Sequence, residues 1–324
     1  MARPLKRFVC QSCGAVTSKW SGRCESCGEW NTITEEAGAA PGPAGAMMAR
    51  GHGGKKGRLL EFTGLTGSTP QPPRYKSGIN EFDRVCGGGL VVGSALLIGG
   101  DPGIGKSTLL LQMAAALAKQ NTACAYISGE EAVDQVRLRA ERLGLADAPV
   151  QLVAATSVRD IVASLERPDA PRVAVIDSIQ TMHSDLIEGA PGTVSQVRAS
   201  AQELIRFAKE RGTALVLVGH VTKDGDLAGP RALEHLVDTV VHVEGDRHHE
   251  RRVVTTTKHR FGPAGEVGLL EMFAGGLVSV DDPSATLLAE RGPALGHEVA
   301  LVGRPMLDLA VADDAAVYAA LAEA

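Results

Sequence analysis

The sequence predicts an α/β domain with a mostly parallel central sheet, preceded by a small module built around four cysteines. Two observations lead to this prediction. Short apolar runs alternate with helical patterns between residues 63 and 280, and two Cys-x-x-Cys pairs lie within residues 1–36. The chain has 324 residues, 44% of them hydrophobic and 22% charged, which is an ordinary globular composition long enough for about two domains.

Residues 1–36 are predicted to form a zinc-ribbon module. Its cysteines are Cys10, Cys13, Cys24 and Cys27. Each Cys-x-x-Cys pair can form a tight knuckle, and four thiolates together give the closed tetrahedral coordination of a structural zinc ion. A segment this short and polar would fold only with its metal bound. We expect the two tryptophans of the chain, Trp20 and Trp30, to cover this site.

The net charge of the chain and its lack of membrane or signal segments narrow the functions that the sequence allows. The net charge of −5 means that any nucleic-acid binding needs a local basic patch, and an aromatic content of 3% argues against base stacking as the main binding device. The basic residues of the first module, Lys6, Arg7, Lys19 and Arg23, fit either DNA contact or a solvated surface. No apolar run of about 18 residues predicts a membrane span, and no apolar segment before Cys10 resembles a secretory signal. We therefore expect a cytoplasmic protein without membrane contact.

Residues 37–62 are rich in Ala, Gly and Pro and predict a flexible linker. The α/β domain follows at residues 63–280. Five nearly continuous apolar runs predict strands covered on both faces. They are Ala95–Ile98, Ala123–Ile127, Val150–Val153, Val173–Ile176 and Leu215–Val218.

Two helices are predicted between these strands, Ser107–Gln120 and Val194–Arg211. The second should begin at a capping box formed by Thr193 and Gln196 and end at Gly212. Beyond Gly245 the pattern changes to strands without long helices, which predicts an antiparallel extension. No fold can be predicted for residues 281–324.

A phosphate-binding loop is predicted directly after the first of these strands. The segment matches G-x-x-x-x-G-K-[ST] and opens a helix, which is the context that the motif requires. Its backbone N–H groups would hold the phosphates of ATP, Lys106 would reach the β- and γ-phosphates, and Ser107 would bind Mg²⁺. A glycine-rich turn without a ligand is the alternative. The predicted nucleotide-binding residues are Gly100, Asp101, Pro102, Gly103, Ile104, Gly105, Lys106, Ser107 and Thr108.

Carboxylates follow two other predicted strands. Asp177 comes directly after Val173–Ile176, where it could serve the metal; the alternative is a cap of the next segment. Glu130 and Glu131 follow Ala123–Ile127, and one of them could orient the attacking water. The alternative is that Glu130 and Glu131 only stabilise the N-terminus of the next helix through its dipole.

Several segments together are typical of one family: Cys10–Cys27, Gly87–Thr108, Val175–Thr181, Gly219–Lys223, Gly229–His235 and Lys258–Gly262. Over residues 1–283 the chain resembles the bacterial RadA (Sms) family of DNA-repair ATPases. The resemblance implies a RecA-like core and a homo-oligomeric ring, with a hexamer as one expected size. It also implies an ATP-dependent motor that processes branched recombination intermediates. The implied partners are single-stranded or branched DNA and a recombinase or replicative helicase.

The resemblance also assigns residues. Glu130 takes the place of the catalytic glutamate, and residues 220–230 take the place of a DNA-contacting, nucleotide-sensing loop. Lys258 and Arg260 occupy the two cationic positions of the family's KNRFG motif, which reach the nucleotide of a neighbouring subunit. In this chain His259 replaces the Asn of that motif. Because Lys258 and Arg260 alternate with His259 along a predicted strand, both cations should point to one side, although a solvated sheet edge is an alternative.

The family carries a large carboxy-terminal domain similar to Lon protease, and only the 44 positions of residues 281–324 follow here, so most of that domain is missing from this sequence. The sequence thus favours a DNA-dependent ATPase of repair and recombination. The alternative is a nucleotide-gated DNA-binding or adaptor protein with little turnover. A RecA-like ATPase that acts on protein instead of DNA is a third hypothesis.

Overall fold

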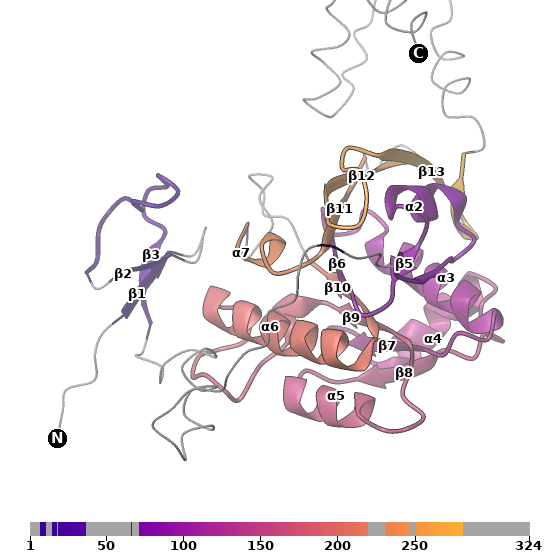
Figure 1. Ribbon diagram of the computed structural model, residues 1–324, viewed down its shortest axis with the longest axis horizontal. Coiled ribbons are helices and arrows are strands. Elements are labelled where there is room, and N and C mark those ends of the chain that lie inside the picture. The colour runs from indigo at the N-terminus through magenta and orange to yellow at the C-terminus, as the bar shows by residue number, and fades with distance from the viewer. Residues whose placement is uncertain are drawn as a thin grey trace, which may run out of the picture. The chain divides into compact units, whose positions relative to one another are not determined.

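Figure 1 shows a computed structural model, which describes residues 7–10, 15–17, 19–36, 66, 71–219, 231–245 and 250–280. The predicted linker, Cys13, residues 220–230 and residues 281–324 lie outside the described residues. Within the described ranges, every helix is too short or too polar to cross a membrane.

The first module contains a small antiparallel sheet. Its strands are β1 (Arg7–Cys10), β2 (Val16–Thr17) and β3 (Ile33–Glu36), and β1 lies between the other two. Cys10 therefore sits at the end of the central strand, where Ile33 is its partner on β3. The sheet packs a small core of Cys10, Cys24 and Ile33, with Phe8 and Ala15 against it.

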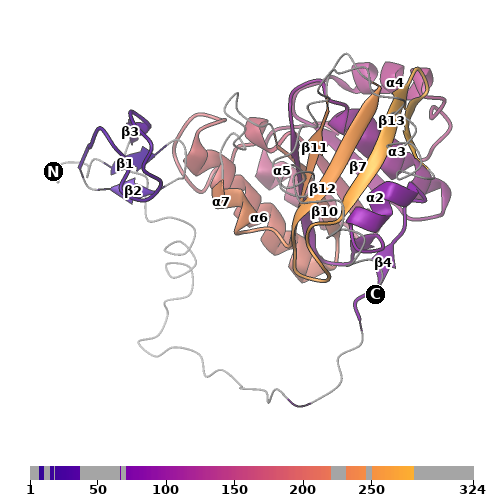
Figure 2. The ribbon, with the colours of Figure 1, turned by 90° about the horizontal axis from the view of Figure 1, so that it is seen from above.

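The second module is built on a sheet of nine described strands (Figure 2). In sheet order these are β14 (Gly276–Ser279), β13 (Val267–Phe273), β12 (Arg251–His259), β11 (Thr239–Glu244), β6 (Ala95–Gly100), β10 (Ala214–Val218), β9 (Val173–Asp177), β7 (Cys124–Ser128) and β8 (Gln151–Ala154). The strands from β11 to β8 run parallel, and β12, β13 and β14 extend the sheet in antiparallel fashion. This arrangement confirms the predicted mostly parallel sheet and its antiparallel extension.

Helices cover both faces of this sheet (Figure 1). On one face α2 (Asn80–Val85), α3 (Lys106–Lys119) and α4 (Val133–Arg142) enclose a core that contains Phe82, Leu110 and Val136. On the other face α5 (Val158–Leu165) and α6 (Val194–Arg211) enclose a second core. Shorter elements complete the described structure: β4 (Arg74–Tyr75), β5 (Leu90–Val91), the 3₁₀ turn η1 (Ile179–Thr181) and α7 (Arg231–Glu234).

The prediction for Val150–Val153 is wrong in one respect. A strand forms there, but β8 is the edge of the sheet and most of its side chains are exposed, Val153 by 45%. An apolar run predicts a strand both in the interior and at the edge of a sheet, and the sequence alone does not show which strand forms the edge.

The predicted capping box at α6 is also wrong. Thr193 is the residue before the helix and Gly212 ends it in a left-handed conformation, as predicted, but the Thr193 side chain bonds to the carbonyl of Ala190 instead of capping the helix. Gln196 turns inward and is 2% exposed. Its amide joins the backbone of Ser184 and Gly189, so this side chain fixes the preceding loop instead of the helix end.

Candidate functional site

The predicted phosphate loop connects the carboxyl end of β6 to the first turn of α3. Gly100 and Gly105 have positive φ angles of 148° and 114°. A Cβ atom at Gly100 would lie 2.3 Å from the carbonyl oxygen of Val243, and one at Gly105 would lie 2.6 Å from the Cε of Met272. Both positions therefore need glycine for conformation, and Gly100 also needs it for space, because its neighbour is a backbone carbonyl; Gly103 faces open space.

Lys106 is folded over this loop. Its ammonium is buried and donates hydrogen bonds to the carbonyl oxygens of Gly100 at 2.6 Å and Asp101 at 2.9 Å. Residues 101–103 are exposed, while Ile104 is buried. The carbonyl of Ile104 accepts a 2.8 Å bond from the buried guanidinium of Arg252 on β12. The loop is thus anchored from the antiparallel extension, with its outer part open to a ligand.

Asp177 lies at the same edge of the sheet as the phosphate loop, because β9 and β6 are parallel and are separated only by β10. Its side chain is 6% exposed and accepts a hydrogen bond from the phenol of Tyr126 on β7. Burial raises the pKa of Tyr126 well above 10, and the negative charge of Asp177 raises it further. The phenol is therefore a neutral donor to this carboxylate.

The two adjacent glutamates have different surroundings. Strand β7 pairs with β9 so that Ser128 lies beside Asp177, and the next turn brings Glu130 to the hydroxyl of Ser178, which donates to its carboxylate. Glu131 instead forms an ion pair with Arg139 of α4. Of the two glutamates, Glu130 is the one that contacts Ser178, the residue directly after Asp177.

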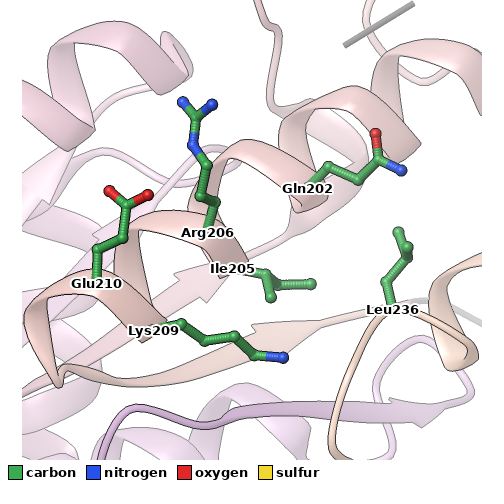
Figure 3. A pocket seen from close by; sticks show the side chains of 6 residues that line it. All are labelled: Gln202, Ile205, Arg206, Lys209, Glu210 and Leu236. Carbon is green, nitrogen blue, oxygen red and sulfur yellow. The ribbon is translucent and has the colours of Figure 1, made fainter. Parts of the chain in front are cut away.

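A groove of about 430 Å³ lies on α6, away from the phosphate loop (Figure 3). It is lined by Gln202, Ile205, Arg206, Lys209, Glu210 and Leu236. None of the predicted nucleotide-binding residues lines it. Lys209 also belongs to a charged cluster at the far end of the sheet.

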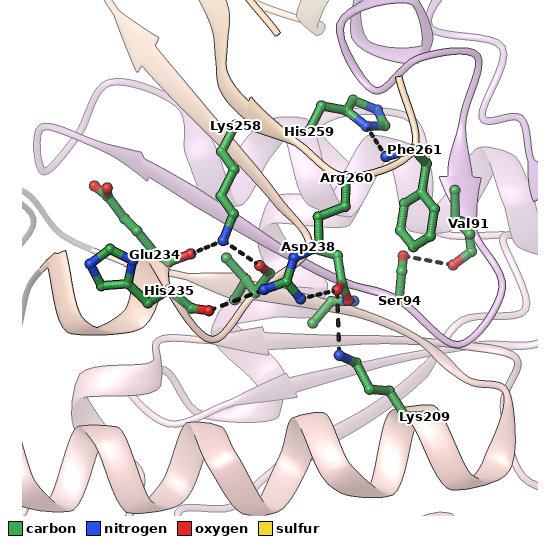
Figure 4. Close-up of polar contacts among 12 residues, drawn as sticks. Val91, Ser94, Lys209, Glu234, His235, Asp238, Lys258, His259, Arg260 and Phe261 are labelled. Carbon is green, nitrogen blue, oxygen red and sulfur yellow. Dashed lines mark hydrogen bonds and ion pairs between the residues drawn. The ribbon is translucent and has the colours of Figure 1, made fainter. Parts of the chain in front are cut away.

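Lys258 and Arg260 lie in that far cluster (Figure 4). Strand β12 runs antiparallel to β11, and β11 is parallel to β6, so the end of β12 lies where β6 begins. Lys258 donates to the carbonyl oxygens of Glu234 and of Val237, and Arg260 donates to the carbonyl of His235 at 3.3 Å. Both cations point to one segment, as the alternation along the strand predicts. They are at the opposite end of the sheet from the phosphate loop of their own chain.

Asp238 is the centre of this cluster. It is 3% exposed, and its two oxygens accept bonds from the backbone N–H of Ala95 at 3.0 Å and from Arg260 at 2.7 Å. Lys209 of α6 approaches the same carboxylate at 3.4 Å. Burial lowers the pKa of Lys258 below 10.5, and the nearby charge of Arg260 lowers it further. The carboxylate of Asp238 thus links three parts of the fold: the start of β6, helix α6, and the residue that follows β12.

His259 points away from Lys258 and Arg260 (Figure 4). Its Nδ1 accepts a 3.0 Å bond from the backbone N–H of Phe261. Its ring packs against Gly87, where a Cβ atom would lie 2.6 Å from the His259 Nε2. In this chain His259 therefore shapes the turn after β12 instead of joining the cationic pair.

The first module brings three of the predicted zinc ligands together. The sulfur atoms of Cys10, Cys24 and Cys27 all lie within 4.8 Å of one another, and Cys10 and Cys24 are buried. The Cys10 and Cys27 sulfurs are 3.7 Å apart. Tetrahedral zinc with Zn–S bonds of about 2.3 Å places its sulfur ligands about 3.8 Å apart, so these thiols fit the metal. Cys13, the fourth predicted ligand, lies outside the described residues.

The tryptophans do not cover this site, contrary to the prediction. Trp20 is 60% exposed and Trp30 is 67% exposed. The indole N–H of Trp20 donates to the carbonyl of Ile33, and the guanidinium of Arg23 lies 5.8 Å from the Trp30 ring centre. The thiols are instead covered by Ile33 and the small core around it.

Four residues that sequence reasoning missed hold these sites together: Tyr126, Ser178, Asp238 and Arg252. Ser178 could have been found, because it directly follows Asp177 in the sequence. The others could not, because their partners lie far away in the sequence. Residues 220–230, the predicted DNA-contacting loop, are outside the described part of the chain.

Comparisons with known proteins match both modules of the chain. The family described as "AAA domain" matches residues 71–226, and "Rubredoxin metal binding domain" matches residues 8–35. A DnaB-like replicative helicase superimposes with a TM-score of 0.55 at 16% identity and covers 64% of this chain and 62% of that chain. The RadB recombinase superimposes with a TM-score of 0.50 at 19% identity, and the match covers 64% of this chain and 100% of that chain. These likenesses show a RecA-like fold.

The sequence relatives are closer. The DNA repair protein RadA of Brucella abortus is 54% identical over 298 residues, which cover 90% of this chain and 63% of the relative. RadA of Pseudomonas aeruginosa is 46% identical and covers 95% of this chain and 67% of the relative. The chain therefore spans about two thirds of the length of these relatives. With a P-loop for ATP and Mg²⁺ and cysteines for a structural zinc, it belongs to the family of bacterial RadA DNA repair proteins.

Proposed function

We propose that this chain is a DNA-dependent ATPase of DNA repair and recombination, which works as a ring-forming motor on branched recombination intermediates. The observation that carries the ATPase part is the meeting of Lys106, Ser107, Asp177 and Glu130 at one edge of the sheet. The relatives named DNA repair protein RadA support the repair part. The likeness to a replicative helicase and to the RadB recombinase supports a motor that acts on DNA.

The nucleotide phosphates would bind to the loop of residues 100–108. The exposed backbone of residues 101–103 offers N–H groups, and the start of α3 adds partial positive charge. Lys106 would exchange its two loop carbonyls for the β- and γ-phosphates. Ser107 and Asp177 would hold Mg²⁺, which neutralises charge on the phosphates when bound.

Glu130 is proposed to orient the attacking water. Its carboxylate lies beside Ser178, at the carboxyl end of the strand that carries Asp177. Glu131 is engaged with Arg139, which favours Glu130 for this role. A carboxylate that holds a water toward the γ-phosphate accelerates its attack without touching the bound nucleotide itself.

Lys258 and Arg260 are proposed to complete the site of a neighbouring subunit. Their position at the far end of the sheet argues against contact with the phosphate loop of their own chain. Two cations on one side of a strand end fit the stabilisation of the charge that develops during phosphoryl transfer. A ring, such as a hexamer, would bring each far end to the next subunit's nucleotide. Residues 220–230 are the proposed DNA contact.

A pair of variants tests this proposal. Glu130→Gln should bind ATP like the parent and lose DNA-stimulated phosphate release by about 10²–10⁴-fold, because only water orientation is removed. Glu131→Gln is the matched control and should retain most turnover. The reverse pattern would overturn the assignment of Glu130. The measurement is phosphate release over a titration of single-stranded and branched DNA.

The same titration separates the alternatives. Salt-dependent DNA affinity without stimulated turnover would favour a nucleotide-gated DNA-binding or adaptor protein, with a recombinase or replicative helicase as partner. Turnover without any DNA affinity would favour an ATPase that acts on protein. Either result would overturn the proposed DNA-dependent motor.

A further inference from the structure

We propose that Tyr126 is a positioning residue of the magnesium site: its phenol holds one oxygen of the Asp177 carboxylate and leaves the other oxygen for the metal shell. This inference rests on the proposed roles of Ser107 and Asp177. It adds a residue that the P-loop motif does not contain and that lies on a different strand from both of them.

The first step of the argument is the position of the ring. Tyr126 is on β7, directly beside β9, and is 1% exposed within the core that α3 covers. From there its hydroxyl reaches the Oδ2 of Asp177 at the end of β9. Within the described part of the chain, no hydrogen bond is formed to the Oδ1 of Asp177. One carboxylate oxygen is therefore fixed from inside the protein, and the other remains available.

The second step is the approach of Ser107. Helix α3 packs against β7, and the Ser107 hydroxyl in the first turn of α3 is a polar neighbour of the Tyr126 phenol, where it acts against the upward shift of the phenol pKa. The phenol gives its one proton to Asp177. Tyr126 thus holds the carboxylate of one proposed metal-side group and lies near the other.

The third step is energetic. The Asp177 side chain is 6% exposed, and a buried carboxylate without a hydrogen-bond donor is strongly unfavourable. A phenylalanine would fill the same core, so packing alone does not require the hydroxyl. The hydroxyl supplies a neutral donor that holds the carboxylate whether or not metal is bound. Groups that orient metal ligands in this manner typically change metal affinity by about 10–100-fold when they are removed.

The test is Tyr126→Phe, which deletes one oxygen and keeps the ring. Binding of a fluorescent ATP analogue is measured in EDTA and over a Mg²⁺ titration. We expect the affinity in EDTA to stay at the parent value, and the Mg²⁺ concentration for half-maximal enhancement of binding to rise by about 10-fold or more. Tyr75→Phe is the matched control, because Tyr75 is a half-buried phenol on β4, and it should leave the Mg²⁺ midpoint unchanged.

The pattern of shifts among these variants decides between the possibilities. An unchanged Mg²⁺ midpoint for Tyr126→Phe, or an equal loss of affinity with and without Mg²⁺, would overturn the positioning role, since the latter is the result of a purely structural defect. Ser107→Ala and Asp177→Asn in the same assay test whether these two residues bind Mg²⁺, which the inference about Tyr126 assumes. If these two variants shift the midpoint and Tyr126→Phe does not, only the positioning inference fails. If neither of them shifts it, the metal-site assignment fails and the inference fails with it.

Discussion

The two ends of the central sheet hold their cations in similar ways but surround them with different partners. At the phosphate-loop end, Lys106 donates to two loop carbonyls, and Asp177 and Glu130 stand nearby at the ends of parallel strands. At the far end, Lys258 donates to two carbonyls around α7, and Arg260 pairs with the buried Asp238. Each cation is held by groups that a phosphate could replace.

The difference between the ends lies in what else they offer. The phosphate-loop end combines a lysine, a serine hydroxyl and two carboxylates, which is enough to bind Mg²⁺ and ATP. The far end has cations and no loop that could hold phosphates among its described residues. One end therefore resembles a nearly complete site, and the other resembles a contribution to a site elsewhere. This asymmetry is what the proposed ring predicts.

The largest expected effect comes from the phosphate-loop end. Lys106→Ala should reduce ATP hydrolysis to background, because the loop loses the buried ammonium that is proposed to bridge the β- and γ-phosphates. Steady-state phosphate release measures it. Lys119→Ala at the other end of α3, where the side chain pairs with the exposed Asp147, is the control and should behave like the parent. Equal activity of both variants would contradict the site.

The next largest effect is expected when the cations at the far end of the sheet are removed. Lys258→Ala and Arg260→Ala should keep ATP binding and lower hydrolysis by about 10³-fold each, the low end for a charge-stabilising finger. Removal of an exposed cation, as in Arg167→Ala, should have no such effect.

Mixing then shows whether the far end acts between subunits. A Lys106→Ala chain retains its far end, and a Lys258→Ala chain retains its phosphate loop, so mixed assemblies should regain activity that neither chain has alone. Continued inactivity at every mixing ratio, with co-assembly confirmed by pull-down, would show that the far end does not act in trans.

A smaller effect tests how the far end is held. Asp238→Asn keeps an acceptor for the N–H of Ala95 but removes the charge shared by Arg260 and Lys209. Since both cations are about half exposed, we expect the free energy of unfolding to fall by about 2 kcal/mol, a value typical of hydrogen bonds to charged groups. Chemical denaturation measures this change. Hydrolysis should fall by less than in Arg260→Ala, and a larger fall would mean that Asp238 does more than hold Arg260.

Sequence reasoning predicted the parts of this molecule that are determined locally. A strand that leads into G-x-x-x-x-G-K-[ST] and a helix identifies the phosphate loop, because glycine conformation and helix polarity are encoded within a few residues. The limits of α6 were predicted for the same reason, since its apolar periodicity ends at Gly212. The candidate zinc ligands also follow from spacing alone.

What could not be predicted depends on partners distant in sequence. The residues around Glu130 and Glu131 do not show which neighbour each glutamate meets, Ser178 or Arg139, and only the family resemblance favoured Glu130. The exposure of β8 depends on its being last in the sheet. Tyr126 resembles an ordinary core aromatic until the ends of β7 and β9 are placed side by side.

The smallest expected effect on basal hydrolysis comes from the zinc module. Cys24→Ala should release the zinc, because a closed four-thiolate site loses most of its affinity with one ligand, and the Cys10 and Cys27 sulfurs are held together by that site. Metal analysis should fall from one equivalent per chain to near zero. Cys124→Ala, which removes a buried thiol in the ATPase module, is the control and should keep its zinc. Basal hydrolysis of the Cys24 variant should stay near the parent value, since every residue proposed for the ATP site lies in the second module, whereas its DNA-stimulated increment should fall. A Cys24 variant that retains a full equivalent of zinc would contradict the ligand assignment, and one that loses zinc and basal hydrolysis together would show that the two modules depend on each other.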